Sequence, residues 1–228
     1  MKSAGKGGFV MAKRPQSKKP RKDGKPEATR DAIIDAAMAC VARDGWRRLS
    51  LAEVAAEAGV SLADVLIPFP TKYAVVNAFQ DRVDARMLAA AEHGGDGDAR
   101  DRLFDLLMER FDALAPYRPA MAEIAKDSLC DPGALCFLPR MARTMARALE
   151  AAGLGASGLG GAVRAKGLAL VYADAFRVWL GDDSADQSKT MAALDRGLRR
   201  AEAAARVLCV TRRARPGAAP DSAAEASA

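Results

Sequence analysis

The chain has 228 residues, of which 50% are hydrophobic and 28% charged, and its formal net charge is +6. This size and composition fit one globular domain, or two small ones, with enough apolar residues to bury a core. No apolar run approaches the roughly 18 residues of a membrane span, and the N-terminus lacks the apolar segment of a secretory signal. We therefore expect a soluble, cytoplasmic chain without stable membrane insertion.

The positive charge is concentrated at the N-terminus. Residues 1–26 contain nine basic residues and one aspartate, a net charge of +8, so the rest of the chain sums to −2. Three prolines and the lack of an apolar period predict that 1–26 is a disordered basic arm. Such an arm either neutralises DNA phosphates or serves only as a solubilising tail. A true start at Met11 instead of Met1 would leave the basic run intact.

The first predicted element is an amphipathic helix from about Glu27 to Arg43. Its apolar residues recur at spacings of three and four, which is the pattern of one helix face. Gly45 is expected to close this helix, because glycine tolerates the left-handed conformation that follows a helix end. The apolar face comprises Ile33, Ile34, Ala37, Cys40 and Val41.

Two capping signatures predict a helix-turn-helix after the first helix. Residues 50–53 (Ser-Leu-Ala-Glu) form a capping box that opens a second helix, which Gly59 ends. Residues 61–64 (Ser-Leu-Ala-Asp) open a short third helix that Pro68 stops. In this interpretation Gly59 takes the tight turn and Val60 fills the angle between the two helices.

Longer helices are predicted for the remainder of the chain, separated by Gly- and Pro-containing breaks. They run from Lys72 to about Glu92, then over Ala99–Leu114, Tyr117–Leu129, Ala134–Ala152, Ala162–Leu180 and Ser184–Leu208. No alternating strand pattern is present, so the predicted fold class is all-α. The predicted domains are an N-terminal three-helix helix-turn-helix domain at 27–72, a helical effector-binding and dimerisation domain at 73–208, and a disordered tail at 209–228.

The sequence offers few residues for a metal or catalytic site. The single histidine, His93, lies in a Gly- and Asp-rich loop, and no Cys-x-x-Cys pair is present, so no metal site is expected. There is no Gly-rich phosphate loop, and the acid pair at 182–183 is interpreted as a helix cap. We expect no cofactor and no enzymatic activity. The cysteines, interpreted as small core residues or idle thiols, are Cys40, Cys130, Cys136 and Cys209.

Residues 30–72 resemble the N-terminal DNA-binding domain of the TetR/AcrR family of bacterial transcription regulators. The matching segments are Arg30-Asp31-Ala32-Ile33-Ile34-Asp35-Ala36-Ala37, Asp44-Gly45-Trp46, Ser50-Leu51-Ala52-Glu53-Val54-Ala55, Ala58-Gly59-Val60-Ser61 and Phe69-Pro70-Thr71-Lys72. The resemblance implies a homodimeric regulator that binds double-stranded DNA and encloses a small apolar effector in its C-terminal domain. It further implies that Ser50 and Lys72 contact phosphates and that the third helix enters the major groove.

The third helix departs from the family pattern, because it is apolar and acidic where relatives often carry polar and basic residues. Its side chains can contact a thymine methyl group but cannot make a bidentate hydrogen bond to a base. Residues 27–90 carry seven basic and nine acidic residues, a net charge of −2 that is poor for a duplex binder. We therefore hypothesise that the arm supplies much of the DNA affinity. The candidate DNA-binding residues are Lys18, Lys19, Arg21, Lys22, Lys25, Arg48, Ser50, Ser61, Leu62, Ala63, Ile67 and Lys72.

The C-terminal body also resembles the lipid-binding accessory family of coenzyme Q biosynthesis, which has a TetR-like fold and has lost DNA binding. The segments concerned are Arg102–Leu107, Leu114–Ala120 and Trp179–Ser184. This resemblance implies an alternative function, in which the chain binds a lipid or isoprenoid on the same scaffold without reading DNA. An acidic and apolar third helix would suit that alternative, whereas the basic arm would have no obvious use in it.

Large apolar side chains on several predicted helices are candidates for an effector pocket, with ordinary core packing as the alternative. They are Met108, Phe111, Tyr117, Met121, Met141, Met145, Tyr172, Phe176 and Trp179. Arg118, Lys166 and Arg177 lie near them and either meet an acid group of the effector or are exposed. The last two helices are rich in alanine and are interpreted as half of a four-helix dimer interface, or else as a hairpin within one chain.

Overall fold

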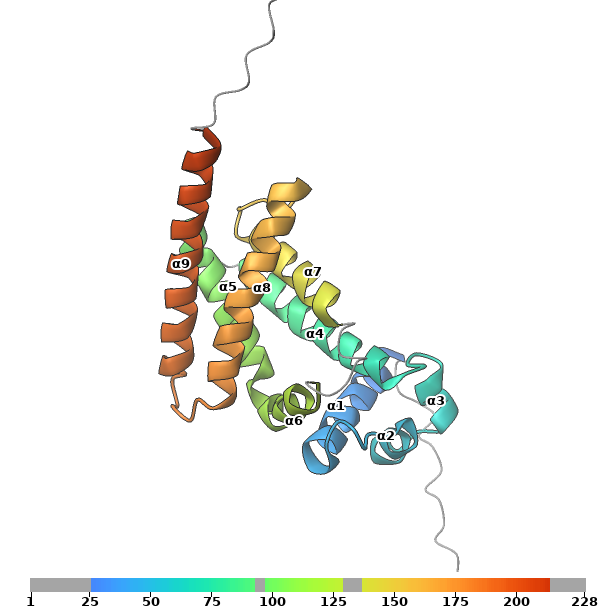
Figure 1. Ribbon diagram of the computed structural model, residues 1–228. Helices are drawn as coiled ribbons and strands as arrows, with labels where there is room; N and C mark the ends of the chain where they lie inside the picture. Colours follow the sequence, from blue (N-terminus) through green and yellow to red (C-terminus); the bar gives the residue numbers. More distant parts are fainter. Residues whose placement is uncertain (1–25, 93–96, 129–136, 214–228) are drawn as a thin grey trace, which may run out of the picture.

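The computed structural model describes residues 26–92, 97–128 and 137–213, and these ranges are helical without any strand (Figure 1). The helices are α1 (Pro26–Asp44), α2 (Leu51–Ala58), α3 (Leu62–Leu66), α4 (Lys72–Ala91), α5 (Ala99–Leu114), α6 (Arg118–Ser128), α7 (Phe137–Ala151), α8 (Gly158–Leu180) and α9 (Ser188–Arg213), with a 3-10 turn, η1 (Ala115–Tyr117), before α6. The predicted all-α fold is confirmed. No helix in the described ranges has both the length and the hydropathy that a membrane crossing requires.

The first three helices form a small unit at one end of the molecule, where α1 packs against α2 and the start of α4 (Figure 1). The predicted apolar face of α1 is buried as expected, and Trp46 and Phe69 fill the space between the helices. Cys40 is a buried core residue, and its burial raises the pKa of the thiol above its usual value. The other three cysteines and His93 lie outside the side chains that the structure describes.

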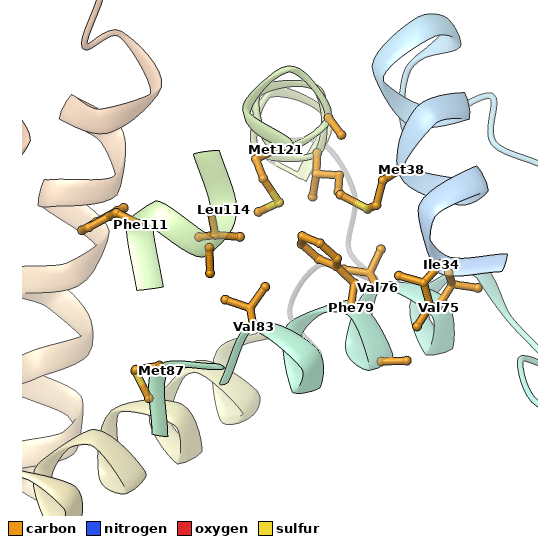
Figure 2. Close-up of a cluster of buried hydrophobic side chains, with 14 of the residues drawn as sticks. Ile34, Met38, Val75, Val76, Phe79, Val83, Met87, Phe111, Leu114 and Met121 are labelled. Carbon is orange, nitrogen blue, oxygen red and sulfur yellow. The ribbon is translucent and has the colours of Figure 1, made fainter. Parts of the chain in front are cut away.

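One continuous hydrophobic core joins this unit to the C-terminal body, and α4 carries it across. Figure 2 shows α4 presenting Val75, Val76, Phe79, Val83 and Met87 in succession along its length. The first of these face side chains of α1, and the later ones face side chains of α5 and α6. A displacement of α4 is therefore felt in both parts of the molecule, because packed cores deform little.

The last two helices begin at other residues than predicted; α8 ends at Leu180 as predicted, whereas α9 also ends later than predicted. Helix α8 starts at Gly158, four residues before the expected Ala162, so Gly158, Gly160 and Gly161 belong to the helix, whereas Gly153 and Gly155 take positive φ in the segment before it. A Cβ atom at Gly161 would lie 2.0 Å from the backbone carbonyl of Ala156, so only glycine fits there. Helix α9 starts at Ser188 instead of Ser184 and ends at Arg213, five residues after the predicted end.

Asp182, interpreted from the sequence as a cap, is buried between the end of α8 and the start of α9. Its Oδ2 accepts hydrogen bonds from the backbone N–H and the hydroxyl of Thr190, at 2.9 and 2.7 Å. Its Oδ1 accepts hydrogen bonds from the N–H and hydroxyl of Ser184. Burial disfavours the charged carboxylate, but these four hydrogen bonds outweigh it and hold the pKa of Asp182 well below its usual value.

Asp182 therefore predicts a pH dependence of stability. Because its pKa is lower in the folded than in the unfolded chain, the ionised group stabilises the fold above about pH 4, and this contribution is lost as the pH falls further. The free energy of unfolding should fall more steeply with acid in the wild type than in Asp182→Asn. Urea unfolding followed by circular dichroism at about pH 5 and about pH 3 measures both slopes. Equal slopes for the two proteins would contradict the prediction.

Candidate nucleic-acid interface and effector cavity

Both predicted capping boxes are present and hold the helix-turn-helix. The N–H of Glu53 donates to Ser50 Oγ, and the N–H of Ser50 donates to the Glu53 carboxylate, each at 3.2 Å. The same reciprocal pair joins Ser61 and Asp64 at 3.1 Å, with a further 2.6 Å bond from the Ser61 hydroxyl. These hydrogen bonds lower the pKa of Asp64. They satisfy the backbone N–H groups at both helix starts, which fixes the boundaries of α2 and α3.

The turn between α2 and α3 has the geometry expected from the sequence. Gly59 takes the left-handed conformation, with φ 67° and ψ 29°, and its N–H points back to the carbonyls of Ala55 and Ala56. The N–H of Val60 donates to the Ala55 carbonyl at 3.0 Å, and the Val60 side chain packs against the core. The positive φ explains the glycine, because other residues reach this region only at a cost.

Helix α3 presents an apolar outer surface at the end of the molecule (Figure 1). Val65 is completely buried and anchors the helix, whereas Leu62, Leu66 and Ile67 are exposed, Ile67 by 83%. Ala63 is exposed beside them. Adjacent exposed apolar side chains on a rigidly capped helix are typical of a surface that contacts a partner.

The predicted phosphate contacts surround α3, but not all of them are free. Arg48 is exposed, and the Ser50 hydroxyl takes part in its capping box. Lys72, at the start of α4, donates to the carbonyl of Trp46 at 3.0 Å and lies 4.5 Å from the centroid of the Trp46 ring. An ammonium group has three N–H donors, so two remain for a phosphate. The arm residues Lys18, Lys19, Arg21, Lys22 and Lys25 lie outside the described residues.

An aromatic cluster joins the helix-turn-helix to the C-terminal body. Trp46 and Tyr73 meet edge to face with ring centroids 5.4 Å apart, and Phe137 of α7 lies 6.5 and 6.0 Å from them. Lys72 rests on the same Trp46 ring. No role was predicted for Phe137 or Tyr73, because nothing in the sequence pattern of α7 indicates that its first residue reaches the N-terminal unit.

A mainly apolar cavity of about 380 Å³ lies between α4, α5, α6, α7 and α8. Its lining comprises Val76, Gln80, Arg110, Leu114, Met121, Ile124, Ala125, Ser128, Phe137, Leu138, Arg140, Met141, Thr144, Tyr172, Ala173 and Phe176. Leu138 and Ala173 are exposed and mark its mouth. The volume is that of a pocket for a small organic molecule. The cavity thus brings together four predicted effector residues, namely Met121, Met141, Tyr172 and Phe176.

The other five predicted effector residues lie elsewhere. Phe111 and Trp179 are fully buried behind the cavity, where Phe111 stacks on Tyr172 with ring centroids 5.0 Å apart. Met145 is buried, and Met108 packs against the core at its edge. Tyr117 instead joins α1, because its hydroxyl donates to Asp35 at 2.9 Å.

None of the three basic residues named near these side chains lines the cavity. The Arg118 guanidinium lies 4.7 Å from the Trp179 ring centroid and donates to the Asp182 carbonyl. Lys166 is exposed, and Arg177 is exposed and paired with Asp174.

At the polar end of the cavity Arg110 forms part of the wall and pairs with Asp84 behind it, both only 1% exposed. Arg110 Nη1 donates to Asp84, and Thr144 Oγ1 donates to the same carboxylate at 2.7 Å. Arg140 Nη2 also donates to Asp84, at 3.2 Å. This cluster was not predicted, since its charged residues come from three helices and look like surface residues in the sequence.

A capped helix-turn-helix with an exposed third helix, joined through α4 to a helical body with an apolar cavity, defines a helix-turn-helix protein. Residues 33–79 match the family of bacterial regulatory proteins described as the tetR family. The TetR transcriptional regulator from Nitrosomonas europaea is 30% identical, with a TM-score of 0.65 over 77% of this chain and 98% of that one. The chain therefore belongs to the TetR family.

Two further proteins are similar to this chain. SmeT, the repressor of the Stenotrophomonas maltophilia multidrug efflux pump SmeDEF, is 25% identical, with a TM-score of 0.50 over 77% of this chain and 91% of SmeT. The mitochondrial ubiquinone biosynthesis protein COQ9 of Drosophila melanogaster is 30% identical over an alignment of 139 positions that covers 55% of this chain. The chain spans 42% of the length of that curated relative.

Proposed function

We propose that the chain is a homodimeric, cytoplasmic transcription regulator that binds double-stranded DNA through residues 27–72 and the basic arm. A small apolar effector in the cavity between α4 and α8 controls its affinity for DNA. The observation that carries this proposal is α3, which its capping box and the buried Val65 hold in place with its outer surface exposed. Membership of the TetR family supports it.

The composition of α3 supports readout of a particular kind. Leu62, Ala63 and Ile67 can pack against thymine methyl groups, so we expect A·T pairs at the positions they reach. Ser61 starts the helix, and its hydroxyl is engaged with Asp64, which keeps that carboxylate in the cap. Phosphate contacts then come from Arg48, Ser50, Lys72 and the arm, which position the helix without reading the sequence.

The aromatic cluster provides a physical connection between effector and DNA. Phe137 lines the cavity and also contacts Trp46, on which Lys72 rests. An effector that displaces Phe137 would therefore move the support of a proposed phosphate contact. Such an effector changes DNA affinity only as far as it binds the two arrangements differently.

The exposed face of α8 supports a dimer. Leu159, Val163 and Leu170 lie on one side of the helix and are all exposed, Leu170 by 74%. Their spacings of four and seven residues keep them on one stripe, which a second α8 could cover. On the other side, α8 packs on α9 so closely that a Cβ atom at Gly197 would lie 2.5 Å from Val171.

We expect Leu170→Glu to convert the dimer to a monomer, because two buried carboxylates would face each other across the interface. Sedimentation equilibrium of the wild type and the variant measures this. Leu154→Glu serves as the control, since Leu154 is also an exposed leucine but lies outside α8. A wild-type monomer, or a Leu170→Glu protein that remains dimeric, would show that this face is not the interface.

Capture of genomic DNA fragments by the full-length protein at graded salt tests DNA binding. Recovery of a palindromic site at moderate salt, lost in Ile67→Glu, is the expected result. Recovery of all fragments at low salt and none above it would indicate a backbone binder and contradict base readout by α3. Recovery of nothing would favour the alternative function, a lipid- or isoprenoid-binding accessory protein, which the likeness to the ubiquinone biosynthesis protein supports.

A further inference from the structure

The cavity lining combines an apolar surface with a charge of one sign. Among its described lining residues the charged side chains are Arg110 and Arg140, and no acidic side chain lines it. The remaining polar groups are Gln80, Ser128 and Thr144, together with the Tyr172 hydroxyl. The rest of the wall is formed by the apolar side chains of Met, Leu, Phe, Ile, Val and Ala residues.

All three guanidinium nitrogens of Arg110 donate hydrogen bonds to other side chains of the protein. Its Nη1 donates to Asp84, its Nη2 to Gln80 Oε1, and its Nε to the Tyr172 hydroxyl at 3.1 Å. Because every nitrogen of this guanidinium has a protein partner, Arg110 is a structural residue, and its charge is balanced by Asp84.

Only two of the three guanidinium nitrogens of Arg140 have hydrogen-bond partners in the described residues. Its side chain is 12% exposed, and its Nη1 donates at 2.8 Å to Asp81, a carboxylate that is 53% exposed and so shared with water. Its Nε is buried and has no hydrogen-bond partner in the described parts of the chain, and the same is true of the Ser128 hydroxyl. Both residues line the cavity. Buried donors without acceptors are rare in native proteins and costly, so two in one cavity indicate a missing acceptor.

The charge balance around Arg140 favours an anion as that acceptor. Asp84 is shared by Arg110 and Arg140, and Arg147 Nη1 lies 3.6 Å from the same carboxylate. Among the groups that are exposed by 12% or less, two guanidiniums, those of Arg110 and Arg140, thus share one carboxylate, that of Asp84. A ligand carboxylate would balance the excess and match the planar donors of arginine.

We propose that the effector is an amphipathic carboxylic acid, whose carboxylate binds Arg140 and Ser128 and whose alkyl part fills the apolar remainder of the cavity. This inference rests on the proposed function, since it concerns the same effector cavity. It differs from the expectation drawn from the sequence, where Arg118, Lys166 and Arg177 were the basic residues considered for an acid group.

Isothermal titration calorimetry of the full-length protein with dodecanoate and with 1-dodecanol, both below their aggregation limits, tests the head group. The two probes share one alkyl chain and differ only at the oxygen end. We expect dodecanoate to bind about tenfold or more tightly, as a charge-assisted hydrogen bond requires. Equal affinities would overturn the proposal that the effector is a carboxylic acid, but they would still agree with the proposal that the cavity binds an effector. Binding of neither probe would overturn both the assignment and the effector part of the proposed function.

The variants Arg140→Gln and Ser128→Ala locate the head group. Arg140→Gln should remove the preference for dodecanoate over 1-dodecanol, and Ser128→Ala should reduce that preference. Both are expected to fold, because Asp84 keeps Arg110 and Thr144 as partners in Arg140→Gln. Arg143→Gln is the matched control, an exposed arginine one turn further along α7 and outside the lining. A preference that persists in Arg140→Gln would place the carboxylate elsewhere and overturn the proposal.

Discussion

Replacing Asp84 by alanine is expected to lower the free energy of unfolding by about 3–5 kcal/mol, the usual cost of removing one partner of a buried ion pair. Asp84 and Arg110 are each only 1% exposed, and Asp84 also accepts from Thr144 and Arg140. Its loss strands a guanidinium in the core with no carboxylate to balance it. Urea unfolding followed by far-UV circular dichroism measures the change.

Asp81→Ala is the control for Asp84→Ala. Asp81 lies on the same helix and also pairs with Arg140, but its side chain is 53% exposed. An exposed pair is worth about 0–1 kcal/mol, so Asp81→Ala should change stability little. Combining Asp84→Ala with Arg110→Met should recover part of the loss, since it removes the stranded charge. If Asp84→Ala were as mild as Asp81→Ala, the buried cluster would not hold α4 and α5 together as described.

Removing residues 1–25, which precede α1, is expected to weaken DNA binding by about 100-fold or more at low salt. Residues 27–90, which contain the helix-turn-helix, carry a net charge of −2. The arm is therefore the main source of positive charge for the DNA. Each phosphate contact contributes about 0.9 to the slope of log affinity against log salt, so the slope should fall by several units. Fluorescence anisotropy with a labelled duplex at graded salt gives both quantities.

A full-length variant separates the charge of the arm from its length. Lys18, Lys19, Arg21, Lys22 and Lys25 are replaced by glutamine, and the loss of affinity should approach that of the deletion. Unfolding curves of all three proteins should coincide if the arm acts only on DNA. Unchanged affinity and an unchanged salt slope after deletion would show that the hypothesis of an arm-driven contribution is wrong.

Local features of the sequence predicted the helix-turn-helix in detail. The capping boxes of α2 and α3 and the turn at Gly59 depend on side chains within four residues of the backbone groups that they satisfy. The bounds of α5 were predicted to the residue, because Asp98 caps its start and Pro116 follows its end. In contrast, the start of α8 was predicted too late, since the glycines of 153–161 gave no sign that Gly161 packs on the Ala156 backbone.

Which residues line the cavity depends on the tertiary structure. Helical periodicity separates buried from exposed positions, and the candidate effector residues are indeed mostly buried. However, periodicity does not distinguish a buried face that borders an empty space from one that meets a neighbouring helix, so Met141 and Phe176 line the cavity whereas Met145 and Trp179 do not.

The buried charged residues could not be predicted from the sequence for the same reason. Arg110 meets Asp84 from 26 residues away and Arg140 meets it from 56, and nothing in the sequence near either arginine marks it as different from a solvated one. Local hydrogen bonds and periodicity, which act over a few residues, therefore determined the helices, their caps and the family resemblance from the sequence by itself. Contacts between distant helices depend on how those helices pack, so only the tertiary structure decided the cavity, its arginines and the aromatic connection to the DNA-binding unit.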